Sequence, residues 1–165
     1  MHETSIRLAV VMQKRVLQNR WQSEVWEPLA VLAGVEHEAE GPRMIRDDGV
    51  ASQWLFPGME MRLHRDEAEG YYLNVSTEAP KVFIMWRLDE ESGDTPMLAV
   101  PQFVTASYNE AGRMMDGGER VDTVPMPPEL VAWVGEFVEQ HYRPEPKKRR
   151  RPQSFVAPGL RDKAP

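Results

Sequence analysis

The middle of the chain alternates between apolar and polar positions, a pattern typical of half-buried β-strands. The alternation is most regular at residues 59–65, where Met59, Met61 and Leu63 share one side. A turn at Pro57-Gly58 is expected to separate this strand from the short aromatic one before it. The pattern predicts an antiparallel meander with strands at residues 53–56, 59–65, 71–77 and 82–88.

Two segments before the meander predict a hairpin. Residues 6–16 alternate loosely in a β-branched setting, and residues 23–33 carry a second apolar series. Residues 19–28, which read NRWQSEVWEP, look like the turn and the adjoining part of the second strand. Pro28 lies inside that strand, and because proline has no N–H to donate, it indicates an edge position or a bulge.

The remaining β-region contains loops and one more strand. Residues 34–49 are polar, acidic and rich in turn residues, so we expect a mobile loop there, and residues 90–94 form a second acidic loop. Residues 97–106 predict a strand, in which Pro101 suggests an edge or a bend. These segments give about seven strands at the spacing of a barrel or sandwich.

The hydrophobic period then changes to that of helices. Ser107 and Glu110 form a capping box, which predicts a short helix ending at Gly117-Gly118. Residues 120–126 are extended, and Pro127-Pro128 opens a second helix. The apolar stripe of the second helix consists of Leu130, Trp133, Val134, Phe137, Val138 and His141. This stripe is expected to pack on the open end of the β-structure, or else to mediate dimerisation.

These elements predict an α+β fold. It is a predominantly antiparallel β barrel or sharply curved sandwich of about seven strands, with a short helix and a C-terminal amphipathic helix, in a pleckstrin-homology-like order. We expect one β-rich domain at residues 1–142. Residues 143–165 are a basic, proline-rich tail that is too polar to build a core, so we expect it to be disordered.

Composition limits the cellular setting and the chemistry. The 165 residues include no cysteine, which excludes disulfides, thiolate metal sites and cysteine nucleophiles. The sequence has no apolar run of membrane-spanning length, and its start lacks the basic-then-apolar order of a secretory signal. We therefore expect a cytoplasmic protein that does not enter a membrane, while its oligomeric state is left open.

The formal net charge of −6 is unevenly distributed. Residues 143–165 contain eight Lys or Arg and two acidic residues, a formal +6, so that residues 1–142 carry a formal −12. An acidic body of this kind resists nonspecific attachment to nucleic acid, whereas the tail is attracted to anionic partners. Salt is expected to weaken any contact that the tail makes.

The sequence contains no recognisable catalytic motif. The four histidines show no metal-binding spacing, no serine lies in GxSxG, and no glycine-rich phosphate loop is present. We therefore predict no catalytic residue, no metal and no cofactor, and a protein that is not an enzyme. A small enzyme with a buried carboxylate pair hidden in the acidic loops is the least favoured alternative.

Two groups of residues are candidates for partner binding. Trp21 and Trp26 lie beside the predicted turn, where indoles serve either as a core plug, the commoner role, or as a recognition edge. The second group is a run of five consecutive cations: Lys147, Lys148, Arg149, Arg150 and Arg151. This run could dock on an acidic protein, bind nucleic acid or remain unengaged.

The chain also resembles a bacterial family of uncharacterised proteins encoded beside molybdenum-containing formate dehydrogenase and its accessory factors. The similar segments are VVMQKRVLQNRWQSEVWEPLAV, KVFIMWRL, SYNEAGRMMDGGERVDTVPMP and LVAWVGEFVEQHYRPEPKKRRR. They span residues 6–151. The resemblance implies an accessory role by genomic association, without implying any chemistry.

The expected function is therefore that of a non-enzymatic accessory or binding protein. Its expected partner is a molybdenum-dependent formate dehydrogenase, or a maturation factor of that enzyme. The alternative is a nucleic-acid-binding or regulatory protein that acts through the basic tail.

Overall fold

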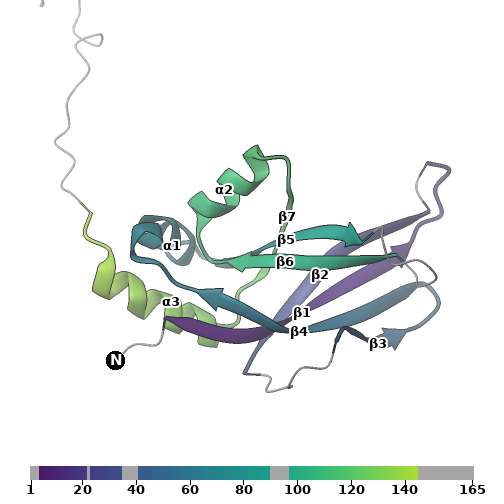
Figure 1. Cartoon of the computed structure of the whole chain (residues 1–165), viewed down its shortest axis with the longest axis horizontal. Helices are drawn as coiled ribbons and strands as arrows, with labels where there is room; N and C mark the ends of the chain where they lie inside the picture. Colours follow the sequence, from purple (N-terminus) through teal and green to yellow (C-terminus); the bar gives the residue numbers. More distant parts are fainter. Residues whose placement is uncertain (1–3, 22, 35–40, 90–96, 145–165) are drawn as a thin grey trace, which may run out of the picture.

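The strands form two antiparallel sheets, with helices gathered at one end (Figure 1). The computed structural model describes residues 4–21, 23–34, 41–89 and 97–144. The four-stranded sheet has the order β2-β1-β4-β3, and the three-stranded sheet has the order β6-β5-β7. The strands are β1 (Ser5–Val16), β2 (Glu24–Ala33), β3 (Arg43–Asp47), β4 (Ala51–Arg62), β5 (Lys81–Asp89), β6 (Leu98–Thr105) and β7 (Arg120–Pro125). The helices are the 3-10 turn η1 (Arg65–Glu67), α1 (Ala68–Val75), α2 (Tyr108–Asp116) and α3 (Pro128–His141).

The predicted N-terminal hairpin is confirmed. β1 pairs antiparallel with β2, and the Leu17 N–H donates to the Ser23 carbonyl at 2.9 Å where the strands meet the turn. β2 is the outer strand of its sheet, and the register shifts beside Pro28. Pro28 therefore occupies the edge-and-bulge position that its missing N–H requires.

The turn predicted at Pro57-Gly58 is wrong. Residues 51–62 form one continuous strand, β4, which pairs with β1 on both sides of the Pro-Gly pair. The register shifts at this point, so Leu8 faces Met59 whereas Val10 faces Phe56. Gly58 has a φ of 78°, which is the left-handed region. The pair therefore makes a bulge that bends the strand instead of reversing it.

The loop predicted at residues 34–49 is wrong in its second half. Residues 43–47 form β3, the outer strand beside β4, and all five are exposed. Two arginines and an aspartate hide the strand in the sequence, since a fully exposed edge strand shows no apolar alternation. Residues 35–40 and the predicted acidic loop at residues 90–94 lie outside the described residues.

The strand predicted at residues 71–77 is also wrong, because residues 68–75 form α1. Asn74 explains the helix: its side chain donates to the Lys81 and Ala106 carbonyls at 2.6 and 2.9 Å and accepts the Lys81 N–H at 2.9 Å. Tyr71 is fully buried one turn earlier. Tertiary contacts thus override the β-propensity of the aromatic and β-branched residues in this segment.

The other two helices are confirmed. Ser107 accepts the Glu110 N–H at 3.0 Å and so caps α2, which ends at Gly117. Pro128 occupies the first turn of α3, and Leu130, Val134, Phe137 and Val138 are its buried stripe. α3 packs beside α1, and the Phe137 and Tyr71 rings form a T-shaped pair with 5.7 Å between centroids.

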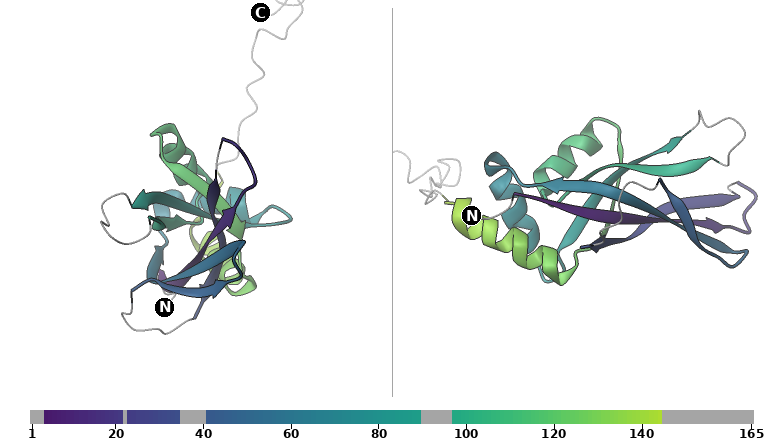
Figure 2. Two further views of the ribbon diagram at one scale, coloured as in Figure 1. Left: turned by 90° about the vertical axis from the view of Figure 1, so that its right-hand side faces the viewer. Right: turned by 60° about the horizontal axis from the view of Figure 1, so that its bottom comes forward.

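The mostly antiparallel α+β class is confirmed, but a closed barrel is not. The described strands form two open sheets around one core that includes Met12, Met61, Ile84 and Leu130. A pleckstrin-homology-like order is not shown, because helices separate β4 from β5 and β6 from β7. Helices cover one end of the sheets, and the strands extend from there toward an end without helices (Figure 2). We call these the helix end and the open end.

Among the helices that the structure describes, none has both the length and the apolar character needed to cross a bilayer.

Candidate functional site

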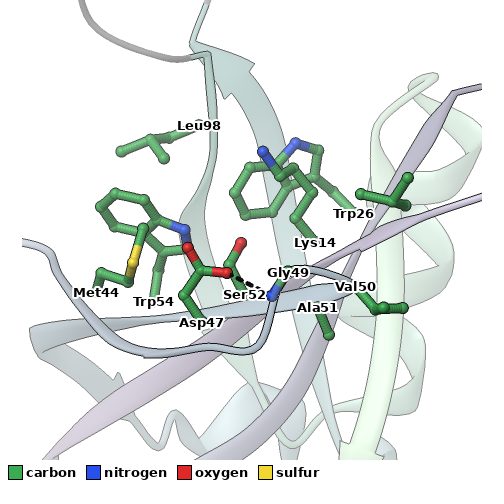
Figure 3. Close-up of a pocket in the computed structure, with 11 residues that line it drawn as sticks. Lys14, Trp26, Met44, Asp47, Gly49, Val50, Ala51, Ser52, Trp54 and Leu98 are labelled. Carbon is green, nitrogen blue, oxygen red and sulfur yellow. Dashed lines mark hydrogen bonds between the residues drawn. The ribbon is translucent and has the colours of Figure 1, made fainter.

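A cavity of about 280 Å³ lies toward the open end, and four strands bring its central residues into one row. Lys14 on β1 lies opposite Trp26 on β2 and opposite Ser52 on β4, while Ser52 lies opposite Asp47 on β3. Residues directly opposite in antiparallel strands point to the same face. The row therefore runs Trp26, Lys14, Ser52, Asp47 across the inner face of the sheet (Figure 3).

The next row supplies the apolar wall of the cavity. Trp54 on β4 is half-buried and lies opposite Met44 on β3, which is 46% exposed. Leu98, at the start of β6, lines the cavity from the other sheet. The cavity thus lies where the two sheets meet, with indole rings from Trp26 and Trp54 in its lining.

The polar groups of the cavity are held in different ways. The Lys14 ammonium lies 5.9 Å from the Trp26 ring centroid, within cation–π range, and 3.6 Å from the Glu24 carboxylate. The Asp47 carboxylate accepts the Gly49 N–H at 3.0 Å. Ser52 is 6% exposed, and its hydroxyl has no hydrogen-bond partner among the described residues. A buried polar group without a partner requires an explanation.

The structure separates the two tryptophans that the sequence singled out. Trp26 is 8% exposed and belongs to the core, whereas Trp21 is 91% exposed beyond the end of β1. The backbone N–H of Trp21 donates to the Asn19 side-chain oxygen at 3.0 Å, which fixes the backbone of the turn. Trp21 is therefore an exposed indole on a turn that is held by a hydrogen bond, and Trp26 lines the cavity.

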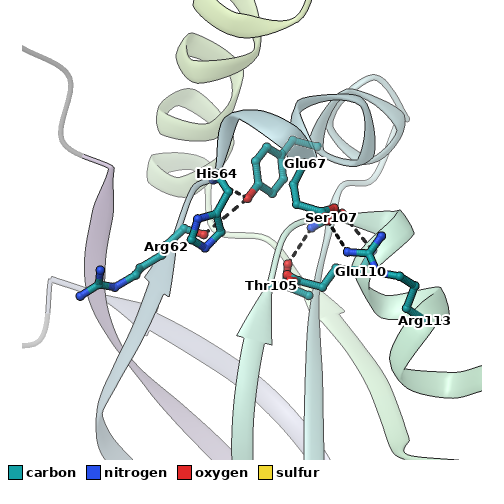
Figure 4. Close-up of polar contacts among 8 residues, drawn as sticks. Arg62, His64, Glu67, Thr105, Ser107, Glu110 and Arg113 are labelled. Atoms are coloured by element: carbon teal, nitrogen blue, oxygen red, sulfur yellow. Dashed lines mark hydrogen bonds and ion pairs between the residues drawn. The ribbon is translucent and has the colours of Figure 1, made fainter. Parts of the chain in front are cut away.

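A polar cluster at the helix end differs from the cavity because its buried groups are paired (Figure 4). The Glu67 carboxylate accepts the Ser107 hydroxyl at 2.5 Å and forms an ion pair with Arg113. Gly70 is needed beside it, since a Cβ there would lie 2.1 Å from the Ser107 oxygen. The cluster joins η1 and α1 to α2.

The described residues provide no obvious metal centre. No group of three or more His, Asp or Glu in the described part of the chain is placed to hold a metal ion. The second predicted binding group, residues 147–151, lies outside the described residues.

Sequence reasoning missed most of the cavity. Lys14, Ser52 and Trp54 attracted no attention because each is ordinary in its own segment. Only the strand register brings them together with Trp26. A usable signal was the polar pair Lys14 and Ser52 at positions that strand alternation assigns to the inner face.

Comparisons with known proteins identify the family. The curated proteins and the solved structures each gave no match. Residues 7–151 match the family described as protein of unknown function, DUF3305. Because this match covers most of the 165 residues, the chain belongs to the DUF3305 family.

Proposed function

We propose that this chain is a non-enzymatic cytoplasmic binding protein that assists the maturation or assembly of a molybdenum-dependent formate dehydrogenase. The observation that carries the binding role is the 91% exposed side chain of Trp21. The formate dehydrogenase partner rests on the sequence resemblance. The two together describe an accessory factor that captures its partner through one aromatic anchor.

Trp21 has the physical properties of an interface anchor. Tryptophan is enriched among the residues that dominate binding energies at interfaces. The hydrogen bond from the backbone N–H of Trp21 to the Asn19 side chain fixes the turn in advance, which lowers the entropy lost on binding. An indole exposed to this extent contributes little to the fold, so its contact area is available to a partner.

The basic run at residues 147–151 has the proposed role of an electrostatic guide. Five adjacent cations accelerate encounter with an acidic protein surface and make the association sensitive to salt. The same five cations favour the alternative function, nucleic-acid binding, because they can neutralise several phosphates.

The test is affinity purification of the tagged full chain from its native cells grown with molybdate, with and without nuclease. Wild type is compared with Trp21→Ala and with a variant in which residues 147–151 are all glutamine. Formate dehydrogenase subunits are expected with wild type, and at least tenfold less of them with Trp21→Ala. Nucleic acid in place of a molybdoenzyme would establish the alternative.

Two controls separate binding from folding. Tyr108→Ala removes another aromatic side chain, 60% exposed on α2 at the helix end, and should retain the partner. Trp21→Ala should melt within a few degrees of wild type, since surface substitutions change stability by about 0.5 kcal/mol or less. Undiminished capture by a folded Trp21→Ala variant would refute the anchor.

A further inference from the structure

We propose that the cavity at the open end binds a small zwitterion with an apolar side chain, namely a free aromatic or branched aliphatic α-amino acid. The order of groups in the central row is the basis of this inference. Lys14 supplies a cation, Asp47 supplies an anion, and Ser52 lies between them on the intervening strand. This binding is independent of partner capture by Trp21.

The spacing of the two charges suits an α-amino acid. Lys14 and Asp47 lie on strands that are separated by one other strand, so their backbones are about 10 Å apart. The α-carboxylate and α-ammonium groups of an amino acid share one carbon, and each can reach one of these side chains. A ligand with a single charge can meet only one of them, and the other then keeps only its contact within the protein, Lys14 with Glu24 at 3.6 Å or Asp47 with the Gly49 N–H at 3.0 Å.

The remaining lining suits an apolar side chain. Trp26, Trp54, Met44 and Leu98 surround the charged row with aromatic and aliphatic surface. Burying the side chain of a leucine or phenylalanine contributes about 1.5–3 kcal/mol. The apolar part of the ligand therefore determines which amino acid is favoured, and the charged part determines its orientation.

Ser52 gives an independent indication of a ligand. Ser52 lines the cavity, and its hydroxyl, which is closed off from solvent, has no partner among the described residues. An unsatisfied buried hydroxyl is unfavourable by about 1–3 kcal/mol. A carboxylate held by Lys14, the residue directly opposite Ser52, offers the missing acceptor.

The volume limits the size of the ligand. Pockets for drug-sized molecules have about 300–1,000 Å³. The cavity, at about 280 Å³, lies just below that range, so it accommodates one amino acid and excludes a dinucleotide-sized molecule.

The test is titration calorimetry of the full chain with four probes of similar shape. These are L-phenylalanine, 3-phenylpropanoate, which lacks the ammonium, 2-phenylethylamine, which lacks the carboxylate, and N-acetyl-L-phenylalanine amide, which lacks both charges. L-Phenylalanine should bind at least tenfold more tightly than each of the others. L-Leucine is the aliphatic probe. The proposal would be overturned if neither L-phenylalanine nor L-leucine showed saturable binding. It would also be overturned if either singly charged probe bound as tightly as L-phenylalanine.

Variants assign each charge to its residue. Lys14→Gln should weaken L-phenylalanine binding at least tenfold without weakening 2-phenylethylamine, and Asp47→Asn should weaken L-phenylalanine without weakening 3-phenylpropanoate. Arg15→Gln is the matched control, because Arg15 is the next residue of β1, on the opposite face, and bonds to Glu27. It should leave binding unchanged, whereas equal losses in all three variants would contradict the assignment.

A site-specific readout excludes binding elsewhere. The chain has five tryptophans, and each indole N–H gives its own signal in a nitrogen–proton correlation spectrum. L-Phenylalanine should shift the signals of Trp26 and Trp54 and leave that of Trp21 in place. Shifts confined to the other three indoles would place the ligand outside this cavity and refute the proposal.

Discussion

At the helix end of the two sheets the buried polar groups have partners, whereas at the open end one of them has no partner among the residues that the structure describes. Asn74 makes three hydrogen bonds to backbone groups at the helix end, and Ser107 both donates to Glu67 and accepts from Glu110. At the open end the Ser52 hydroxyl is buried and unpaired among the described residues. The two ends share one hydrophobic core. They differ in whether their buried polar groups are paired and in whether helices cover the strands.

This contrast separates stability from binding. Paired polar groups stabilise the fold and need no ligand to satisfy them. An unpaired buried hydroxyl lowers stability, and it becomes favourable only when a ligand pairs with it. The open end, with Trp21 in the adjoining turn, therefore carries both proposed binding sites.

The largest expected effect is at the helix end. Phe137 is 1% exposed and packs against Tyr71, so Phe137→Ala should lower the free energy of unfolding by about 3–5 kcal/mol, measured in urea. Phe103→Ala is the control, because Phe103 on β6 is 38% exposed and its loss should amount to about 1 kcal/mol or less. Equal losses at the two positions would show that the helix end is no more tightly packed than the surface of β6.

A matched pair of serine substitutions sharpens the comparison. Ser107→Ala removes a helix cap and a donor to Glu67, and it should lower the free energy of unfolding by about 1–2 kcal/mol. Ser52→Ala removes a buried hydroxyl that has no partner among the described residues, so it should raise the free energy of unfolding, by up to about 1–3 kcal/mol. Urea denaturation measures both changes, and a larger loss for Ser52→Ala would reverse the roles assigned to the two ends.

The last effect is one of pH and is confined to alkaline solution. Burial raises the pKa of Tyr71 to about 12, whereas an unfolded tyrosine ionises near 10. Folding therefore favours the protonated phenol, and this contribution is present below pH 10 and is lost as the pH rises through about 12. Tyr71→Phe should decline less steeply in stability than wild type across that window, as followed by urea denaturation at several pH values. Parallel curves would show that Tyr71 does not contribute.

The fold was predictable where local patterns and tertiary packing agree. Alternation identified β1 and β5, and the capping serine with the proline pair identified α2 and α3. Prediction failed at residues 71–77 because the bonds that hold the helix connect Asn74 to residues 7 and 32 positions away. It failed at Pro57-Gly58 because turns and bulges use the same residues, and only the pairing with β1 distinguishes them.

The candidate site was predictable only in part. The sequence directed attention to Trp21 and Trp26, but it could not separate an exposed indole from a buried one in the same segment. The charged row joins residues from four strands, and a shift of one position would turn Lys14 to the outer face. Such a site is specified by register, which no local pattern contains.

The position of β1 between β2 and β4 has a consequence for synthesis on the ribosome. β1 and β2 are adjacent in the sequence and can pair early, but the second edge of β1 is covered only when residues 51–62 have been synthesised. At about 5–20 residues per second, the roughly 30 residues from the end of β2 to the end of β4 take roughly 2–6 s. During this interval the nascent hairpin exposes the edge of an apolar strand, the kind of edge that other chains can pair with.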